Sequence, residues 1–357
     1  FSTSIDGVDG TDDDLTINSG TGTLTLQAIG ATQALSTLNI NTAATSTANI
    51  SLPNIGDAGN DGVDGATNIG NSLTNQLTIS GTIYKTGGAT DYEAKSGNTI
   101  LLTGVSPTIT TGGADLSFST GNLVLSSAGT TTFTTGSGSA GGITVAGTID
   151  GTNGQDEALA LESGSGAIQL QGTIGGTNPV TTLAINSTNG SAGTIEIVGI
   201  GDSDTAGATG AVTVGNTSTG TLTLDGTIYK TDDAQTYVAA TGQNIDITGA
   251  ATFTTTNDAV AFNTSGVDLA NNGTTTINTG TGAGTVTFQG AIETDGGNDD
   301  ILTVTSGTGN VTFTGAIGAT EELGGLNVNS SAGDGDITFT STIGDSGNAG
   351  IIGTTAI

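Results

Sequence analysis

The sequence predicts an all-β chain folded as a parallel β-helix (β-solenoid), in which short strands stack turn upon turn. Three observations predict this fold: a long internal repeat, a shorter apolar rhythm inside each repeat, and alternation of apolar and polar residues within short segments. The chain has 357 residues, with 62 glycines and no cysteine, histidine, methionine or tryptophan. We expect about 24 residues per coil and about 15 coils.

The long repeat divides the chain into modules. The segment 81–86 (GTIYKT) returns at 226–231, which is 145 residues later. The landmark Ile29-Gly30 recurs at Ile174 and again at Ile317, and the landmark Ile55-Gly56-Asp57 recurs at Ile200 and again at Ile343, at nearly the same offset each time. We therefore assign a first module copy to residues 1–144, a second to residues 145–287 and a partial third to residues 288–357, all within one continuous solenoid.

The shorter rhythm predicts which side chains stack inside the solenoid. Apolar landmarks recur after about 24 residues, which is the length of one coil rather than of a helical turn. At this coil length, six coils fill one copy. The expected stacking pairs are Ile17 with Ile40, Leu26 with Leu52, Ile29 with Ile55, Val304 with Val328, Phe313 with Phe339, and Ile317 with Ile343.

Within each coil, alternation indicates strands with one buried face. Residues 23–26 (TLTL) and 285–288 (TVTF) place an apolar side chain at every second position. Clusters of Gly, Asn, Asp and Ser separate these segments and supply the positive φ angles that tight corners require. Stacking each coil on the next pairs its backbone groups and joins the inward side chains into one column.

Two other fold classes fit the sequence less well. Tandem immunoglobulin-like sandwiches would need domains of about 100 residues built around large aromatic anchors, whereas only 3% of residues are aromatic. Disorder is suggested by the formal net charge of -30. However, 33% hydrophobic residues in regular alternation indicate that a core forms.

Composition narrows the setting and the partners. The 33 acidic residues outnumber Lys85, Lys95 and Lys230, the three basic ones, so we expect no nucleic-acid binding and no attraction to anionic membranes. No apolar run is long enough for a membrane-spanning helix, so we expect no membrane insertion, and no signal peptide is recognisable. The scarcity of basic and oxidisable residues indicates an extracellular or cell-surface location.

An acidic pair that returns in every copy is the candidate metal site. Carboxylates in glycine-rich corners suit a hard cation, so calcium is the predicted ligand. The alternative is a solvated corner in which these side chains accept hydrogen bonds from nearby backbone. Asp6, Asp150 and Glu293 form a second aligned acidic set. The predicted ligands are Asp12, Asp13, Asp156, Glu157, Asp299 and Asp300.

We expect neither catalysis nor a cofactor other than calcium. Paired carboxylates can in principle hydrolyse glycosides, but the chain has no His, Arg or Cys to serve as a tuned base or a cationic group. Outward Thr pairs such as Thr23 and Thr25 are similar to those of ice-binding solenoids. One coil later the outward positions are Asn49 and Ser51, so the ladder does not persist.

Two tyrosines also recur at the module offset. Tyr84 and Tyr229 follow apolar strand residues, and Tyr92 and Tyr237 lie one corner further on. Exposed tyrosines can stack on sugars, but their positions favour packing. We expect the lysine after the first tyrosine of each pair to offset the charge of acidic neighbours.

The runs 307–318 (GTGNVTFTGAIG) and 323–329 (LGGLNVN) resemble repeats of large bacterial surface proteins of the filamentous-haemagglutinin-like and giant adhesin type. That resemblance lies in the general character of the repeats and extends over the whole chain. It implies a secreted, right-handed β-helix that acts as a stalk, adhesin or matrix fibre, but it assigns no binding role to any residue. We therefore expect a structural segment of an extracellular surface protein or filament; the alternative is an adhesin module that recognises glycans or a partner cell surface.

The positions within the module at which the chain begins and ends lead to an expectation about partners. Phe1 aligns with Val145, the last inward residue of a strand, and Ile357 aligns with Val214 part-way through a module. An uncapped solenoid exposes a coil edge that can pair with another chain. We expect either continuation in a longer chain or self-association end to end.

Overall fold

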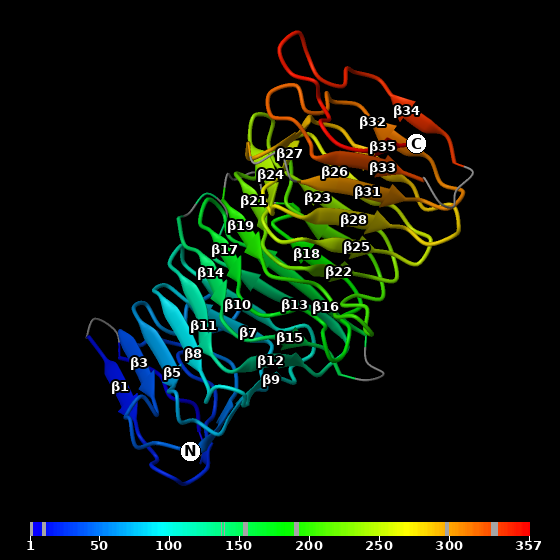
Figure 1. Cartoon of the computed structure of the whole chain (residues 1–357). Helices are drawn as coiled ribbons and strands as arrows, with labels where there is room; N and C mark the ends of the chain where they lie inside the picture. Colours follow the sequence, from blue (N-terminus) through cyan, green and yellow to red (C-terminus); the bar gives the residue numbers. More distant parts are fainter. Residues whose placement is uncertain are drawn as a thin grey trace. The chain divides into compact units, whose positions relative to one another are not determined.

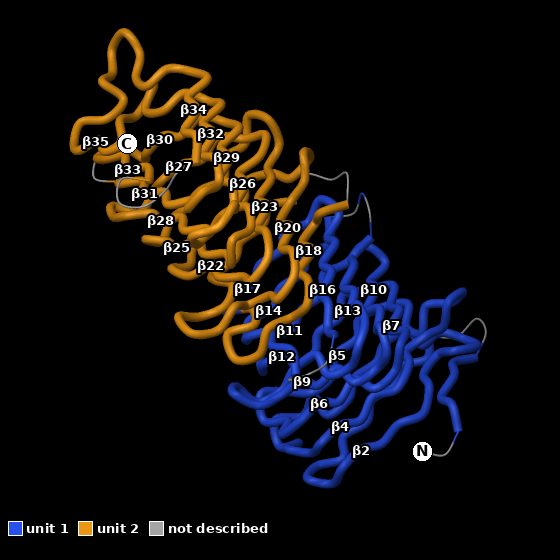
Figure 2. The backbone as a smooth tube through the Cα atoms, turned by 90° about the vertical axis from the view of Figure 1, so that its right-hand side faces the viewer, with its two compact units in different colours: residues 1–173 blue, residues 174–357 orange. Residues whose placement is uncertain are grey.

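The structure is a computed structural model that describes residues 3–8, 12–136, 138, 140–152, 156–188, 193–296, 300–329 and 335–357. In these ranges the chain forms a β-solenoid with about 13 turns spaced roughly 25 residues apart (Figure 1), which confirms the predicted fold class. The described strands pair in parallel, and none of the described residues forms a helix that could cross a membrane. The chain divides into two compact units, residues 1–173 and 174–357 (Figure 2).

Unit 1 has three parallel sheets, and the chain visits them in turn. Each sheet is named here after its first strand. The β1 sheet consists of β1 (Asp14–Ile17), β3 (Thr37–Ile40), β5 (Thr67–Gly70), β8 (Thr90–Glu93), β11 (Leu116–Thr120), β14 (Ile143–Val145) and β17 (Ile168–Leu170). The β2 sheet consists of β2 (Leu24–Thr25), β4 (Asn49–Leu52), β6 (Gln76–Ile79), β9 (Thr99–Leu102), β12 (Asn122–Leu125) and β15 (Ile149–Asp150). The β7 sheet consists of β7 (Ile83–Thr86), β10 (Thr108–Thr111), β13 (Gly129–Thr134) and β16 (Glu157–Glu162).

Unit 2 repeats this three-sheet plan. The β18 sheet consists of β18 (Leu183–Ile185), β20 (Val212–Val214), β23 (Gln235–Val238), β26 (Val260–Asn263), β29 (Val286–Phe288), β32 (Val311–Phe313) and β34 (Ile337–Phe339). The β19 sheet consists of β19 (Ile195–Ile197), β21 (Leu222–Leu224), β24 (Asn244–Ile247), β27 (Gly266–Leu269) and β30 (Ile292–Thr294). The β22 sheet consists of β22 (Ile228–Lys230), β25 (Thr252–Thr254), β28 (Thr274–Asn278), β31 (Ile301–Thr305), β33 (Gly325–Val328) and β35 (Thr355–Ala356).

Strand register follows the predicted apolar rhythm. Alternation places one side chain in two inside, as in β18, where Leu183 and Ile185 are buried and Ala184 lies between them on the outer face. Each inward residue then lies on the inward residue of the next turn. The structure confirms the predicted partners Ile17 with Ile40, Ile29 with Ile55, Val304 with Val328, Phe313 with Phe339, and Ile317 with Ile343.

An aromatic ladder fills part of the interior of unit 2. Tyr237, Phe262, Phe288, Phe313 and Phe339 stack on consecutive turns of the β18 sheet, with ring centroids 4.9 to 5.4 Å apart and interplanar angles of 18° or less. The first four of these side chains are fully buried. This spacing is close to the strand repeat of about 4.8 Å, so the backbone ladder sets the ring stacking.

Turn length varies, and this explains why there are fewer turns than the predicted 15. Along one line of inward residues in unit 1, Ile5 pairs with Ile29, Ile29 with Ile55, and Ile55 with Tyr84. Each step along this line is longer than the one before it. The longer turns carry loops that leave the solenoid wall, so fewer turns fit into the same chain length.

Candidate functional site

A pair of loops on consecutive turns is the main departure from the regular solenoid. In β7 the single outward residue Lys85 separates the inward Tyr84 and Thr86. One turn earlier, residues 56–62 replace that single residue, and two turns earlier residues 30–34 do so. We call these two segments together the loop pair. The second and third copies have equivalent loop pairs at 175–179 with 201–207 and at 318–322 with 344–350.

Backbone hydrogen bonds attach the loop pair to the solenoid wall. The Gly56 N–H donates to the Ile29 carbonyl at 2.8 Å, and the Leu35 N–H donates to the Gly62 carbonyl at 3.0 Å. The Gly62 N–H in turn donates to the Lys85 carbonyl at 2.8 Å. The second copy repeats these three bonds at 2.8, 3.0 and 2.7 Å. The loops therefore begin and end on the same hydrogen-bond ladder as the strands.

Glycine is required where the longer loop closes. A Cβ atom on Gly62 would lie 2.2 Å from the Gly56 nitrogen and 2.8 Å from the Ile29 carbonyl oxygen. The equivalent Gly207 has the same close approach, at 2.2 Å from the Gly201 nitrogen. Because these neighbours are backbone atoms, no side-chain movement can relieve the contact.

An aspartate at the start of the longer loop fixes its turn. Asp57 Oδ1 accepts hydrogen bonds from the Gly59 N–H at 2.7 Å and the Asn60 N–H at 2.8 Å. These bonds favour the ionised carboxylate and hold the pKa of Asp57 below its ordinary value. Asp202 and Asp345 occupy the equivalent positions, and the pKa of each is lowered by the same kind of bond.

Acidic residues from the preceding turn hold the shorter loop. Asp6 Oδ1 accepts from the Thr32 N–H at 2.8 Å, and this bond is the main reason that the pKa of Asp6 is lowered. Glu293 Oε2 accepts from the Thr320 N–H at 3.0 Å and the Glu321 N–H at 2.9 Å in the third copy. Asp6 and Glu293, two members of the second acidic set, thus accept hydrogen bonds from loop backbone on the next turn, whereas Asp150 Oδ2 accepts from the Thr148 hydroxyl at 3.3 Å.

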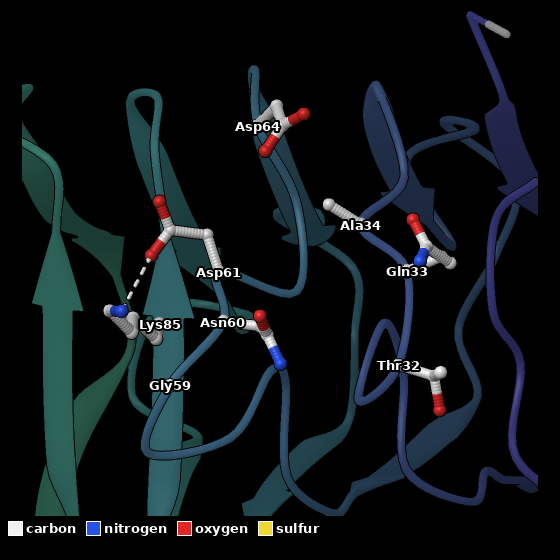
Figure 3. Close-up of a pocket in the computed structure, with 8 residues that line it drawn as sticks. All are labelled: Thr32, Gln33, Ala34, Gly59, Asn60, Asp61, Asp64 and Lys85. Carbon is white, nitrogen blue, oxygen red and sulfur yellow. Dashed lines mark ion pairs between the residues drawn. The ribbon is translucent and has the colours of Figure 1, made fainter. Parts of the chain in front are cut away.

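The first loop pair encloses an open polar pocket of about 320 Å³ (Figure 3). Lys85 Nζ lies 3.2 Å from Asp61 Oδ1, and about a third of each side chain is exposed. An ion pair at this exposure adds little stability, so its main effect is to orient polar groups. The pocket is lined by Thr32, Gln33, Ala34, Gly59, Asn60, Asp61, Asp64 and Lys85.

The copies keep the framework of the loop pair but vary its lining. Asp61 is replaced by Ala206 in the second copy, where Lys230 Nζ donates to the Ser203 carbonyl at 3.0 Å. Both lysines lie beside acidic loops, as predicted, and each lowers the pKa of a nearby aspartate as a minor cause. The loop framework is therefore a structural constant, while its surface chemistry changes from copy to copy.

All four tyrosines are buried, with exposed fractions of 0%. The Tyr84 hydroxyl donates to the Leu52 carbonyl at 2.9 Å and accepts from the Gly81 N–H at 2.6 Å. Tyr229 makes the equivalent bonds to Ile197 and Gly226. The prediction that these residues serve in packing is confirmed, and their rings are not exposed for stacking on sugars.

The predicted calcium ligands fall at the starts of different strands. Asp12 and Asp13 precede β1, Asp156 and Glu157 lie at the start of β16, and Asp300 precedes β31. Asp299 lies outside the described residues. Asp156 is exposed whereas Glu157 is buried, so being adjacent in sequence does not place both carboxylates of that pair in one space. The β1 and β16 pairs lie on different sheets.

The second member of each pair accepts backbone hydrogen bonds. Asp300 is fully buried, and its Oδ1 accepts from the Asn271 N–H at 3.1 Å. Glu157 is 1% exposed, and its Oε1 accepts from the Thr152 N–H at 3.2 Å. The other carboxylate oxygen of each has no hydrogen-bond partner among the described residues. In this part of the chain no three potential ligands gather around a metal-sized space.

A ladder of carboxylates lies on the outer face of the β19 sheet. Asp246, Asp268 and Glu293 are register partners on β24, β27 and β30. Burial is the main reason that the pKa of Asp268 is raised, and the nearby charges of Asp246, Asp295, Asp300 and Glu293 add to it. Like charges directly opposite each other in a sheet destabilise it, so this ladder is an electrostatic cost to unit 2.

The loop pair offers carboxylates, amides, hydroxyls and one lysine, which can hold a polar ligand by hydrogen bonds. The repeat landmarks Ile29-Gly30 and Ile55-Gly56-Asp57 mark the starts of the two loops, which their recurrence in the sequence alone did not indicate. Comparison of the chain with family models, with curated proteins and with solved structures finds no match. The fold itself makes the chain a β-solenoid repeat protein.

Proposed function

We propose that the chain is a structural segment of an extracellular repetitive surface protein or filament, of the filamentous-haemagglutinin-like or giant adhesin type, where it acts as a stalk, matrix fibre or adhesin shaft. The observation that carries the proposal is the stacked interior. Inward aliphatic and aromatic side chains lie on their counterparts in the next turn in most of the described strands, so each turn stabilises its neighbours.

The outer surface supports the same role. With 33 acidic and three basic residues, the surface repels polyanions and limits lateral clumping of shafts. We propose that the chain is not an enzyme, because it has no histidine, arginine or cysteine to complete a catalytic group with its carboxylates.

A glycan array tests the proposal against the alternative, an adhesin module that recognises glycans or a partner cell surface. The pocket between residues 30–34 and 56–62 is the observation that favours the alternative. A pure shaft gives no signal above background on the array. Specific binding on the array would overturn the shaft proposal. The site is located at this pocket if binding is lost in the double variant Gln33→Ala, Asp64→Ala and kept in the equivalent double variant of the second copy, Asn178→Ala, Thr209→Ala.

End-to-end self-association, or continuation in a longer chain, remains our proposal for the partner. In the last turns of unit 2, the exposed fractions of Ile343, Ile352 and Ile357 are 41%, 53% and 61%. Phe339 stacks on Phe313 alone among the described rings. Burying this edge against another solenoid turn removes apolar surface from water. Sedimentation velocity across a hundredfold range of concentration tests the self-association arm.

Calcium at the three acidic pairs stays a proposal with one supporting observation. Glu157 and Asp300 each bury a carboxylate oxygen without a hydrogen-bond partner among the described residues, and a hard cation binds such oxygens. Thermal melting with calcium and with chelator is the test, with Asp300→Asn as the variant. Calcium that raises the midpoint of the wild type and not of the variant supports a site at Asp300, and an unchanged midpoint rejects it.

A further inference from the structure

The module length and the turn length do not match, and unit 2 shows the consequence. The loop pair of the second copy continues the β22 sheet, since Ile174 pairs with Ile200 and Ile200 with Tyr229 on β22. The loop pair of the third copy continues the β19 sheet, since Ile292 on β30 pairs with Ile317 and Ile317 with Ile343. Equivalent loops in successive copies therefore lie on different sheets of one solenoid.

The register gives the size of this offset. From Ile174, the line of paired inward residues runs through Ile200, Tyr229, Phe253 and Ile277 to Val304, which is five turns. The chain then crosses β32 of the β18 sheet and reaches Ile317 on the β19 sheet. That is two further sheets out of three, so one module occupies five and two-thirds turns rather than the expected six.

Unit 1 shows the same count of whole turns. From Ile29, the paired inward residues run through Ile55, Tyr84, Ile109 and Phe133 to Leu161, again five turns. One strand, β17, then precedes Ile174 in the sequence. The first module therefore also occupies five whole turns and part of another. Because both modules show this fraction of a turn, it does not arise from one irregular corner.

We propose that this mismatch is a device for presentation: each module places its loop pair on the next of the three faces, and three modules return it to the first. The inference rests on the proposed role as a shaft, because it concerns what that shaft presents along its length. It fits a partner that surrounds the shaft, such as a matrix, rather than one that lies along a single side. Whole-turn modules would have aligned all loop pairs on one face.

Distance measurement between two spin labels tests the proposal. Ser203 and Ser346 are exposed equivalents in the longer loops of the second and third copies, and the chain has no cysteine to interfere. Five and two-thirds turns at about 4.8 Å give an axial separation of roughly 27 Å. Loops on different faces add a lateral separation, so the distance between the labels in a Ser203→Cys, Ser346→Cys variant should exceed this value by on the order of 10 Å.

The control pair lies on one sheet. Thr213 on β20 and Thr338 on β34 face outward on the β18 sheet, five turns apart, so labels in a Thr213→Cys, Thr338→Cys variant should be separated by roughly 24 Å. A loop distance within a few ångströms of the control would show that the loops share a face and would overturn the proposal. The glycan array does not depend on this geometry, so failure of the shaft function and failure of the presentation device are distinguishable.

Discussion

Removal of one ring from the aromatic ladder should be among the most damaging single changes to unit 2. Phe288 is 1% exposed, and its ring lies 5.0 Å from Phe262 and 5.4 Å from Phe313. Truncation of a buried phenylalanine to alanine costs about 3–5 kcal/mol through lost transfer free energy and the cavity left behind. The rings above and below are held by their own strands and cannot close the gap, so we expect Phe288→Ala to cost about 4 kcal/mol of unfolding free energy.

Chemical denaturation followed by circular dichroism measures this loss. Each turn contacts only its neighbours, so the variant can also split a single transition into two, one for the turns on each side of the substitution. Hydrogen exchange should then locate the loss of protection at β26, β29 and β32. Thr287→Ala, on the outer face of the same strand, is the matched control and should cost less than about 1 kcal/mol. Equal losses of unfolding free energy in the two variants would refute the view that stacking of interior side chains is the main source of stability.

Three further predictions concern the loop pair and the surface charges. Gly62→Ala should lower the melting temperature and the exchange protection of residues 56–62, because its Cβ would clash with backbone atoms, while Gly59→Ala, whose Cβ has no neighbour closer than 3.5 Å, should be nearly neutral. The pKa of Asp57 is lowered by folding, so its contribution is present above the ordinary value of 3.8 and is lost as the pH falls through the folded pKa. Between pH 6 and pH 2 the melting temperature should fall further in the wild type than in Asp57→Asn, which keeps the lowered pKa values of Asp6, Asp202 and Asp345 but lacks that of Asp57. The pKa of Asp268 is raised, so its charge destabilises the fold at neutral pH. Asp268→Asn should therefore raise the free energy of unfolding by about 0.2–1 kcal/mol at pH 7, and this gain should vanish near pH 3. The exposed control Asp336→Asn should show no such gain.

The interior of the solenoid was predictable because inward residues had to satisfy two spacings at once. Ile17 and Ile40, for example, each alternate with polar neighbours and are separated by one coil. Period two marks the buried face, and the coil spacing marks the partner on the next turn. Only a parallel stack meets both conditions, so fold class and register followed from apolar residues alone.

The loop pair was not predicted, because an apolar landmark looks the same before a corner and before a loop. Ile55-Gly56-Asp57 was recognised as a repeat marker, although its aspartate already indicated a local turn with Gly59 and Asn60. The fractional turn was missed for a related reason. A single average coil length concealed the difference between the turn from Ile5 to Ile29 and the longer turn from Ile55 to Tyr84, and averaging forced a whole number of coils per copy.

The candidate metal residues show the limit of alignment by residue type. Asp13, Glu157 and Asp300 align as a recurring acidic position, yet the sequence could not show that Asp300 is buried and accepts hydrogen bonds from backbone. Burial of a carboxylate depends on the adjacent turn, whose register is a three-dimensional property. The sequence favoured packing for the tyrosines, but it could not show that the Tyr84 and Tyr229 hydroxyls donate to the Leu52 and Ile197 carbonyls.

The direction of the hydrogen bonds between turns has a mechanical consequence. In a stack of parallel coils these bonds point along the stacking direction, so tension applied along it pulls them open in series, one coil after another, instead of shearing a whole sheet at once. Each released coil of roughly 25 residues frees about 85 Å of extended chain. Under load, such a segment would lengthen by one coil at a time, and opening the hydrogen bonds of each coil would absorb work.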